Sequence, residues 1–506
     1  MRSARRIVAG ALVGAAVLAA LPWRSLAEDP PRARDVTLVY TGDLEGELEP
    51  CGCTEGQLGG LARRAAWINA AKATGEHVVL LDSGDLYFRR EAIPKILEPQ
   101  LRLKARTIAG IHERLHYVPA ALGELDLSLG LEAFEGLGRT PLLANADESI
   151  KVSGSPVVDA GGCRVGVLGL ASPALLKPSG VDAGDPIEAA RREVAALGDR
   201  ADLVVCVSHL GLDGDKALAA AVPGIDVIVG GHDGLSMEPP VRVGRTLIVQ
   251  ANRQGRFLGR MRLHLLPDWR KADLFDASEN ERWGELAVEY DATVERFAGQ
   301  RDAATSPGDR ERAQHGVEQY AEEAKEARSR IRDLSDRSWF ANRLVPLDAR
   351  VQDDPEVAKL VSLYKEEAKR LNESLADALA AAPAEGPAYV GGASCVECHK
   401  GEHEGWRKTA HARAFETLVS RGQEMDLECI GCHTTAFQGK GGFFLPSKAG
   451  DWKGVQCEAC HGPGEGHPKR KLIAAPTKDA CVRCHQPPQQ ERFDYDSALP
   501  VARHGK

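Results

Sequence analysis

One short pattern occurs four times in the last quarter of this chain of 506 residues, and it constrains how that part can fold. In each copy two cysteines stand three positions apart, and a histidine directly follows the second one. The copies are Cys395, Cys398 and His399; Cys429, Cys432 and His433; Cys457, Cys460 and His461; and Cys481, Cys484 and His485. The surrounding region is poor in long apolar runs, so its core must come from something other than side chains.

This pattern suits covalent attachment of haem. Two thiols three positions apart can each add to one vinyl group of a haem, and the histidine that follows can bind the iron. Paired Cys-x-x-Cys units also build zinc sites, but zinc does not require a histidine after every second cysteine. The four copies therefore predict four covalently bound haem c groups.

A family resemblance covers the region from about Gly391 to Lys506. The segments that carry it are WRKTAHARA from Trp406, VQCEACHGPGEGH from Val455, FDY from Phe493 and RHG at residues 503–505. They resemble the tetrahaem cytochromes c that accept electrons in nitrifiers. The resemblance implies a haem-packed, mostly α-helical cytochrome domain over residues 390–506 that exchanges electrons with redox partner proteins.

Each haem iron also has a second axial face. The resemblance implies that His411, His467 and His504 are distal ligands of this kind. For His403 a surface position and ligation stay equally open, and Met425 is expected to pack rather than to ligate. Three distal histidines for four haems would leave one iron open or weakly ligated, as a site for a small molecule.

The first residues have the layout of a secretory signal peptide. Arg2, Arg5 and Arg6 precede an apolar run from Ile7 to Leu21. This run of about 15 residues is shorter than the roughly 20 that a spanning helix needs, which disfavours an uncleaved anchor. We expect a signal peptide over residues 1–27, and a mature protein without a transmembrane segment in the periplasm or another exported compartment.

Charge and periodicity divide the rest of the chain. The formal net charge of −9 lacks the basic excess of a nucleic-acid binder. Residues 35–266 alternate β-branched runs with helical stretches, which predicts an α/β layered fold. Residues 281–382 are charged, with apolar residues at helical spacing. We expect two long helices there, broken around Pro346, that form a helical hairpin or spacer without chemistry of its own.

Five segments of the first region resemble calcineurin-like metallophosphoesterases, above all secreted 5′-nucleotidases and the related thiosulfohydrolases. The segments are YTGDLEG from Tyr40, GGLAR from Gly59, LDSGD from Leu81, SHLGLDGD from Ser208 and GIDVIVGGH from Gly224. The resemblance implies a four-layer α/β sandwich over residues 35–266. It also implies one or two divalent metal ions, of Mn, Zn or Fe, at the strand ends, where two ions would orient a bridging water.

The resemblance also implies roles for single residues. Asp43 corresponds to a ligand of the first metal, and Asp85 to the carboxylate that bridges both metals. His209 and His232 correspond to ligands of the second metal. Glu124 stands where the family has an asparagine ligand, and its carboxylate is a plausible replacement.

Three further departures concern catalysis. Glu45 replaces a histidine ligand of the first metal, and Asp233-Gly234 stands where the family ends its Gly-His-x-His motif. Leu125 replaces the histidine that protonates the leaving group. Because a leucine cannot act as a general acid, efficient hydrolysis of phosphate esters by the usual route is not expected.

A Cys-x-Cys pair, Cys51 and Cys53, follows the Asp43 and Glu45 segment closely. It can be a strained and labile disulfide, a pair of soft metal ligands, or a redox-active thiol pair that feeds the haems. We favour the functional alternatives.

These features together predict an exported multihaem c-type cytochrome that transfers electrons to or from a redox or binding site on a remodelled metallophosphoesterase domain. The alternative is a metal-dependent hydrolase of phosphate or sulfur esters, with accessory haems and a small-molecule substrate. A non-enzymatic scaffold in a respiratory complex is a third hypothesis.

Overall fold

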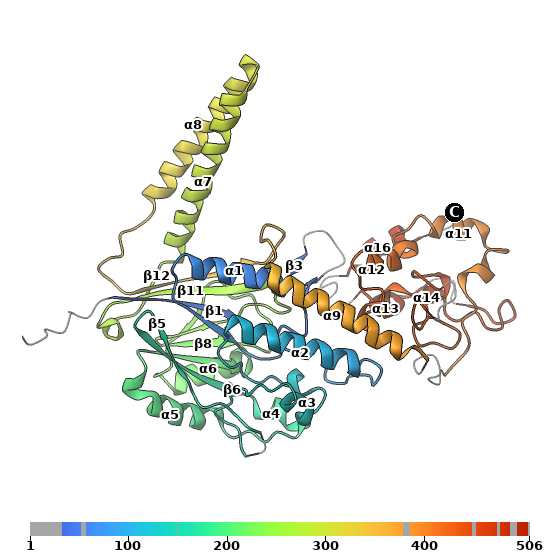
Figure 1. Cartoon of the computed structure of the whole chain (residues 1–506), viewed down its shortest axis with the longest axis horizontal. Coiled ribbons are helices and arrows are strands. Elements are labelled where there is room, and N and C mark those ends of the chain that lie inside the picture. Colours follow the sequence, from blue (N-terminus) through green and yellow to red (C-terminus); the bar gives the residue numbers. More distant parts are fainter. Residues whose placement is uncertain are drawn as a thin grey trace, which may run out of the picture.

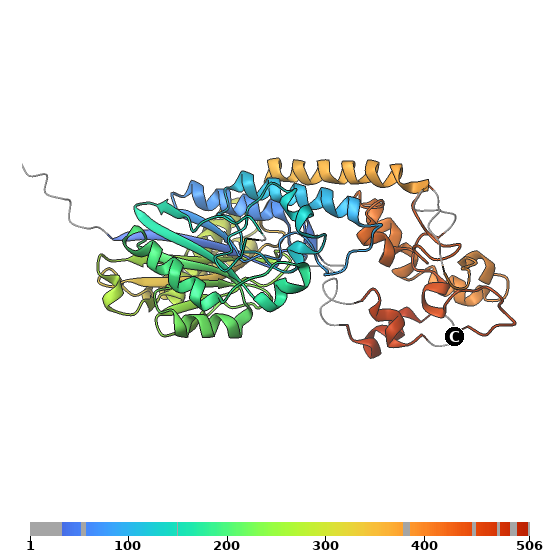
Figure 2. The same cartoon turned by 90° about the horizontal axis from the view of Figure 1, so that it is seen from below.

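The computed structural model describes residues 33–51, 57–148, 150–377, 385–447, 452–472, 476–485 and 493–503. An α/β body lies at one end of the molecule and a region of short helices at the other, and α9 (Pro355–Ser374) runs from the first toward the second (Figures 1 and 2). The predicted signal peptide, Cys53 and His504 lie outside the described residues.

The first sheet has five strands in the order β12-β13-β11-β1-β4. They are β1 (Arg34–Thr41), β4 (Val78–Asp82), β11 (Phe257–Leu265), β12 (Phe275–Asp276) and β13 (Trp339–Pro346). β1 and β4 run parallel, whereas β11 is antiparallel to both β1 and β13. The chain therefore leaves β1 and β4 at the same edge of the sheet.

The second sheet has six strands in the order β5-β6-β7-β8-β10-β9. They are β5 (Val157–Ala160), β6 (Cys163–Ala171), β7 (Leu203–His209), β8 (Val227–Gly230), β9 (Val241–Val243) and β10 (Thr246–Val249). β6, β7, β8 and β10 are parallel, and every residue of β7 and β8 is buried. This is expected for parallel strands that are covered on both faces.

Side chains alternate between the two faces of each sheet. They form one apolar layer between the sheets and one on the outer face of each sheet. Leu38 of β1 and Val205 of β7 meet between the sheets. Val39 instead packs under α1 (Leu61–Ala73), α2 (Glu98–Leu115) and α9, whereas Cys206 packs under α5 (Pro186–Leu197) and α6 (Gly211–Ala221). The predicted four-layer α/β sandwich is confirmed.

The predicted helical spacer over residues 281–382 is different in the structure. α7 (Ser278–Ala303) and α8 (Pro307–Ser329) form a hairpin that projects from the body (Figure 1). β13 then returns to the first sheet and pairs with β11 from Trp339 to Pro346. The expectation of helices alone is therefore wrong here. Pairing with β11 holds residues 339–346 extended, and α9 packs against α1 and α2 instead of completing a hairpin.

The region of the Cys-x-x-Cys-His motifs consists mainly of short helices and turns. They are η5 (Gly392–Cys395), α11 (Lys400–Trp406), η6 (His411–Arg413), α12 (Ala414–Val419), α13 (Leu427–His433), α14 (Cys457–His461), α15 (Lys478–Val482) and α16 (Tyr495–Ala502). The expectation of a mostly α-helical region is confirmed. Within the described ranges, no helix is both long and apolar enough to cross a membrane.

We expect β13 to be an integral part of the α/β body, pinned by a buried hydrogen-bond network. Tyr40 Oη donates to Asn342 Oδ1 at 2.8 Å, and Asn342 Nδ2 donates to the Glu238 carbonyl at 2.6 Å. Asn342→Ala leaves buried polar groups without partners and should lower the free energy of unfolding by about 2–4 kcal/mol. Urea denaturation followed by circular dichroism measures this loss.

The matched control is Asn69→Ala, since Asn69 is exposed and bonds Asp354 at the surface. This change should cost about 1 kcal/mol or less. Equal losses in the two variants would show that the Asn342 network does not hold β13 in place.

Candidate functional site

Five of the six predicted metal ligands lie where strands of the two sheets end. Asp43 and Glu45 follow β1, Asp85 follows β4, His209 ends β7 and His232 follows β8. The sixth, Glu124, begins a short 3₁₀ turn. Ligands of α/β folds commonly gather at the carboxyl ends of parallel strands.

Four of these residues have a strained backbone. The φ angles are 48° for Asp43, 53° for Glu45, 52° for Asp85 and 75° for His232. Residues other than glycine rarely adopt this left-handed conformation, and such strain concentrates at functional sites. The fold therefore holds these residues in an unfavourable conformation at the ends of the strands.

Two groups of these residues could each hold a metal ion. Glu124, His209 and His232 form one group, and Asp43, Asp85 and His209 form the other. His209 Nε2 lies 3.0 Å from Glu124 Oε2 and 3.3 Å from Asp85 Oδ2, and His232 Nδ1 lies 3.1 Å from Glu124 Oε1. The replacement of the family's asparagine by Glu124 thus keeps an oxygen beside both imidazoles.

The orientation of His209 suits metal binding. Its Nδ1 donates a hydrogen bond to the Ser83 carbonyl at 2.8 Å, which leaves Nε2 unprotonated when the imidazole is neutral. Histidine ligands of metals commonly use a backbone carbonyl in this way. Ser83 itself was not predicted, because a carbonyl group carries no sequence signal.

The residues predicted for the first metal are less complete as a ligand set. The two ligand groups formed by the described residues do not include Glu45. Gln254 Nε2 donates to Glu45 Oε2 at 2.9 Å, and Arg253 Nη1 lies 3.8 Å from Glu45 Oε1. Asp233 accepts a hydrogen bond from the Leu212 amide at 2.5 Å. Local partners thus engage both carboxylates.

Burial and charge set the protonation of the cluster in the absence of a cation. Burial raises the pKa of Asp43 to about 7, and the charge of Asp85 adds to this. Burial opposes ionisation of Glu124 too, but hydrogen bonds from His209 and His232 hold its pKa well below the usual range. The pKa of His209 is raised well above normal, because the carboxylates of Asp85 and Glu124 outweigh its burial. A divalent cation would relieve the repulsion among these buried carboxylates.

Sequence reasoning did not find the role of Asp126, which holds the Asp85 loop. Its carboxylate accepts hydrogen bonds from four backbone amides, those of Asp85, Leu86, Tyr87 and Gly123, at 2.7–3.1 Å. Burial and the charge of Asp85 raise the pKa of Asp126 to about 7. It is a positioning residue, and three of its four partners come from a loop about forty residues earlier in the chain.

Asp126→Asn should destabilise this loop. The amide of asparagine has one oxygen and one nitrogen, so its NH₂ group would face backbone donors that now bond a carboxylate. We expect a loss of about 2–4 kcal/mol in the free energy of unfolding and weaker metal binding. Urea denaturation and metal titration measure the two effects, and unchanged values of both would show that Asp126 does not hold the loop.

The segment from Glu45 to Cys51 connects this cluster with the C-terminal region. Glu45 bonds Gln254 at the cluster, and four residues later Glu49 accepts hydrogen bonds from Gln423 at 2.9 Å and Lys365 at 2.6 Å. Pro50–Cys51 then forms β2, which pairs with β3 (Leu58–Gly59). The backbone of Cys51 thus follows directly on the segment that contacts both the cluster and the C-terminal region.

The four Cys-x-x-Cys-His motifs can be tested for their fit to haem. The ring centres of His399 and His467 are 6.4 Å apart, and those of His411 and His485 are 6.0 Å apart. Because a metal–imidazole bond is about 2 Å long, two imidazoles on opposite faces of one iron have ring centres about 6 Å apart. These separations fit distal roles for His467 with the first motif and for His411 with the fourth.

Hydrogen bonds fix the ring nitrogens of two of the histidines in this region. Nδ1 of His433 donates to the Ala414 carbonyl at 2.6 Å, and Nδ1 of His467 donates to the Arg470 carbonyl at 3.2 Å. Both rings thus keep Nε2 for iron. His403 instead packs on Trp406, and Met425 is buried in the apolar core.

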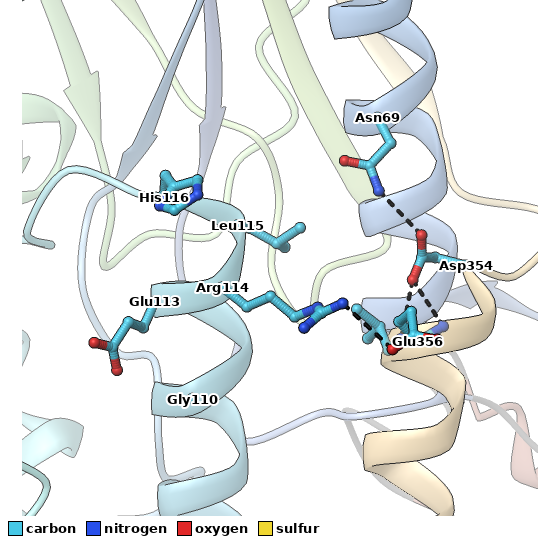
Figure 3. A pocket seen from close by; sticks show the side chains of 9 residues that line it. Asn69, Gly110, Glu113, Arg114, Leu115, His116, Asp354 and Glu356 are labelled. Atoms are coloured by element: carbon cyan, nitrogen blue, oxygen red, sulfur yellow. Dashed lines mark hydrogen bonds and ion pairs between the residues drawn. The ribbon is translucent and has the colours of Figure 1, made fainter.

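A separate surface hollow of about 690 Å³ lies between the end of α2 and the start of α9 (Figure 3). Arg114 Nη2 lies 3.4 Å from Glu356 Oε2 within it, and Asn69 Nδ2 donates to Asp354 at 3.0 Å. Its lining residues belong to neither ligand group. The chemistry of the cluster is therefore not located there.

Comparison with known proteins supports both halves of this description. Residues 394–462 match the family described as "Cytochrome c554 and c-prime", and residues 450–490 match the doubled CXXCH motif. The C-terminal region is of the cytochrome c554 type. Cytochrome c-554 of Nitrosomonas europaea is 35% identical to it over 91 residues, which are 15% of this chain and 39% of that protein. A c554-type region implies covalently bound haem.

The region before the c554-type region matches 5′-nucleotidases. The 5′-nucleotidase of Diplobatis ommata is 28% identical over 273 residues, which are 45% of either chain. The structure of a 5′-nucleotidase precursor from Thermus thermophilus aligns with 67% of this chain. The alignment spans 60% of the precursor, with 21% identity and a TM-score of 0.45. The SoxB sulfate thiohydrolase of the same species covers 67% and 62%, with 17% identity and a TM-score of 0.45. The chain spans less than half the length of the two curated relatives.

Proposed function

We propose that this protein is an exported multihaem c-type cytochrome that transfers electrons, fused to a remodelled metallophosphoesterase domain that binds metal and serves as a redox or binding site. The c554-type region supports electron exchange with partner proteins. The proposed compartment is the periplasm or its equivalent, where covalent haem attachment takes place.

The observation that carries this proposal is the short path between the two regions. Five residues separate Glu45 at the carboxylate–histidine cluster from Cys51, and Glu49 within that span bonds Gln423 of the c554-type region. Cys51 and Cys53 are proposed as a redox or ligand pair on this path.

We propose four haem c groups, attached through the eight cysteines of the four motifs. Haem supplies one-electron chemistry at its iron. His399, His433, His461 and His485 each take the proximal position, fixed by the adjacent cysteine. His411, His467 and His504 take distal positions, and the Nδ1 hydrogen bonds of His433 and His467 fix the orientation of their rings.

The cluster of the first domain is proposed to hold one ion of Mn, Zn or Fe. His209, His232, Glu124 and Asp85 would bind it, and Asp43 and Glu45 would supply part of a second site. The Leu125 amide donates to Asp85 Oδ1 at 2.9 Å and thereby orients this carboxylate. The side chain of Leu125 cannot deliver a proton to a leaving group.

A second candidate function is hydrolysis of phosphate or sulfur esters by this cluster. The two ligand groups that share His209 favour it, since a pair of nearby ions can orient a water molecule for attack. The loss of the general acid at Leu125 weighs against it. A small-molecule substrate is part of this alternative.

Metal and haem analysis of the purified full chain separates these functions. We expect four haems c per chain by pyridine haemochrome spectra, together with about one other metal ion by mass spectrometry. Fewer than four haems would contradict the haem assignment. Turnover of phosphomonoesters with added Mn²⁺ that disappears in His209→Ala would establish the hydrolase instead.

The Cys51→Ala, Cys53→Ala double variant tests the thiol pair. Haem reduction by candidate donors should slow in this variant if the pair connects the cluster to the haems. Stopped-flow spectroscopy of the haem bands measures the rate. The matched control is Cys163→Ala, because Cys163 is a core cysteine in β6. Equal rates in the wild type and the double variant with every donor would contradict a role in electron transfer.

A further inference from the structure

The attachment helix of the second haem motif is bound directly to the first domain. α13 carries Cys429, Cys432 and His433, and its first turn contacts α2. Gln100 of α2 donates to Asp426 Oδ1 at 2.6 Å and accepts from the Leu427 amide at 3.0 Å. The residues just before Cys429 are therefore held by the first domain.

A buried amide extends this contact to α9. Asn372 Nδ2 lies 2.7 Å from Gln100 Oε1 and 2.8 Å from the Met425 carbonyl, and it donates to both. Gln100 and Asn372 are fully buried. Because buried hydrogen bonds of this kind are costly to break, they fix the direction of α13 relative to α2 and α9.

A buried ion pair lies immediately beside the first cysteine of this motif. Lys104 of α2 pairs with Glu428, and each side chain is only 8% exposed. Burial alone would raise the pKa of the Glu428 carboxyl. The charges of Lys104, Arg89 and Arg90 outweigh burial and hold this pKa below its usual value. The pair thus keeps two opposite charges at a fixed place next to Cys429.

The apolar surroundings of the motif also come from both regions. Leu427 and Ile430 of α13 are buried in the same cluster as Leu97 and Leu101 of the first domain, and Cys429 packs against this cluster. Water is largely excluded at such a junction, so the charges within it are weakly screened.

We propose that the haem attached at Cys429 and Cys432 occupies an interdomain site, in which α2 and α9 orient the attachment helix. The Lys104–Glu428 pair places two compensating charges beside this haem, and either charge alone would shift its reduction potential. The proposal rests on the haem assignment above. Lys104 and Glu428 act through their position and their charges, and neither is placed as an iron ligand.

Two variants of the ion pair should move one reduction potential in opposite directions. Ferric haem carries one more positive charge than ferrous haem. Lys104→Met leaves the Glu428 carboxylate alone, which favours the ferric form and lowers the potential. Glu428→Gln leaves the Lys104 ammonium alone and raises it. The double variant has neither charge and should return the potential close to that of the wild type.

The measurement is a spectroelectrochemical titration of the full-length haem-loaded protein, in which the haems titrate as successive one-electron waves. We expect one wave to shift and the others to stay in place. Arg245→Gln is the matched control, because Arg245 is a first-domain arginine that pairs with Asp273 at the surface. It should shift no wave.

Removing one partner of a buried ion pair is destabilising, so the single variants could fail to fold. Arg90→Gln then provides the test, since Arg90 is exposed and its charge acts on Glu428. It should lower the potential of the same wave. Unchanged potentials in variants that retain four haems would overturn the interdomain site, whereas a wild-type protein without four haems would overturn the proposed function instead.

Discussion

One apolar cluster joins the two halves of this protein, and the rest of the architecture depends on it. It begins under α1, α2 and α9 on the outer face of the first sheet and continues to Phe415, Ile430 and Phe443 of the c554-type region. α9 belongs to both sides, because Val361 packs in the cluster while Asn372 near its end bonds the Met425 carbonyl. The cytochrome region is thus mounted on the phosphoesterase domain through shared core packing.

Much of the fold could be predicted from local patterns, but β13 could not. The buried parallel strands show as β-branched runs, and the candidate metal ligands lie at their ends. Residues 339–346 contain Arg343 and Pro346 and lie between two helical patterns. Their strand conformation depends on β11, about eighty residues earlier, and such pairing is a tertiary effect that propensity does not reveal. The apolar stripe of α9 likewise does not predict which helices it packs against.

The candidate site likewise has features that the sequence predicts and contacts that it does not predict. Motif spacing predicts which residues converge, namely Asp43, Asp85, His209 and His232. It does not predict that Gln254 engages Glu45, because that contact crosses 209 positions of the chain. The proximity of His467 to His399 of the first motif also requires the three-dimensional path of the chain.

The late position of β13 in the chain affects the order of assembly. The first sheet lacks a paired neighbour for β11 on one side until residues 339–346 have been synthesised, and an unpaired strand edge is prone to wrong pairing. The projecting hairpin of α7 and α8 is synthesised before β13. The first haem motif begins about fifty residues after the end of β13. A nascent chain therefore completes its first sheet shortly before the haem-binding cysteines appear. Chain order thus allows the surface of α2 and α9 beside α13 to form before the haem region folds.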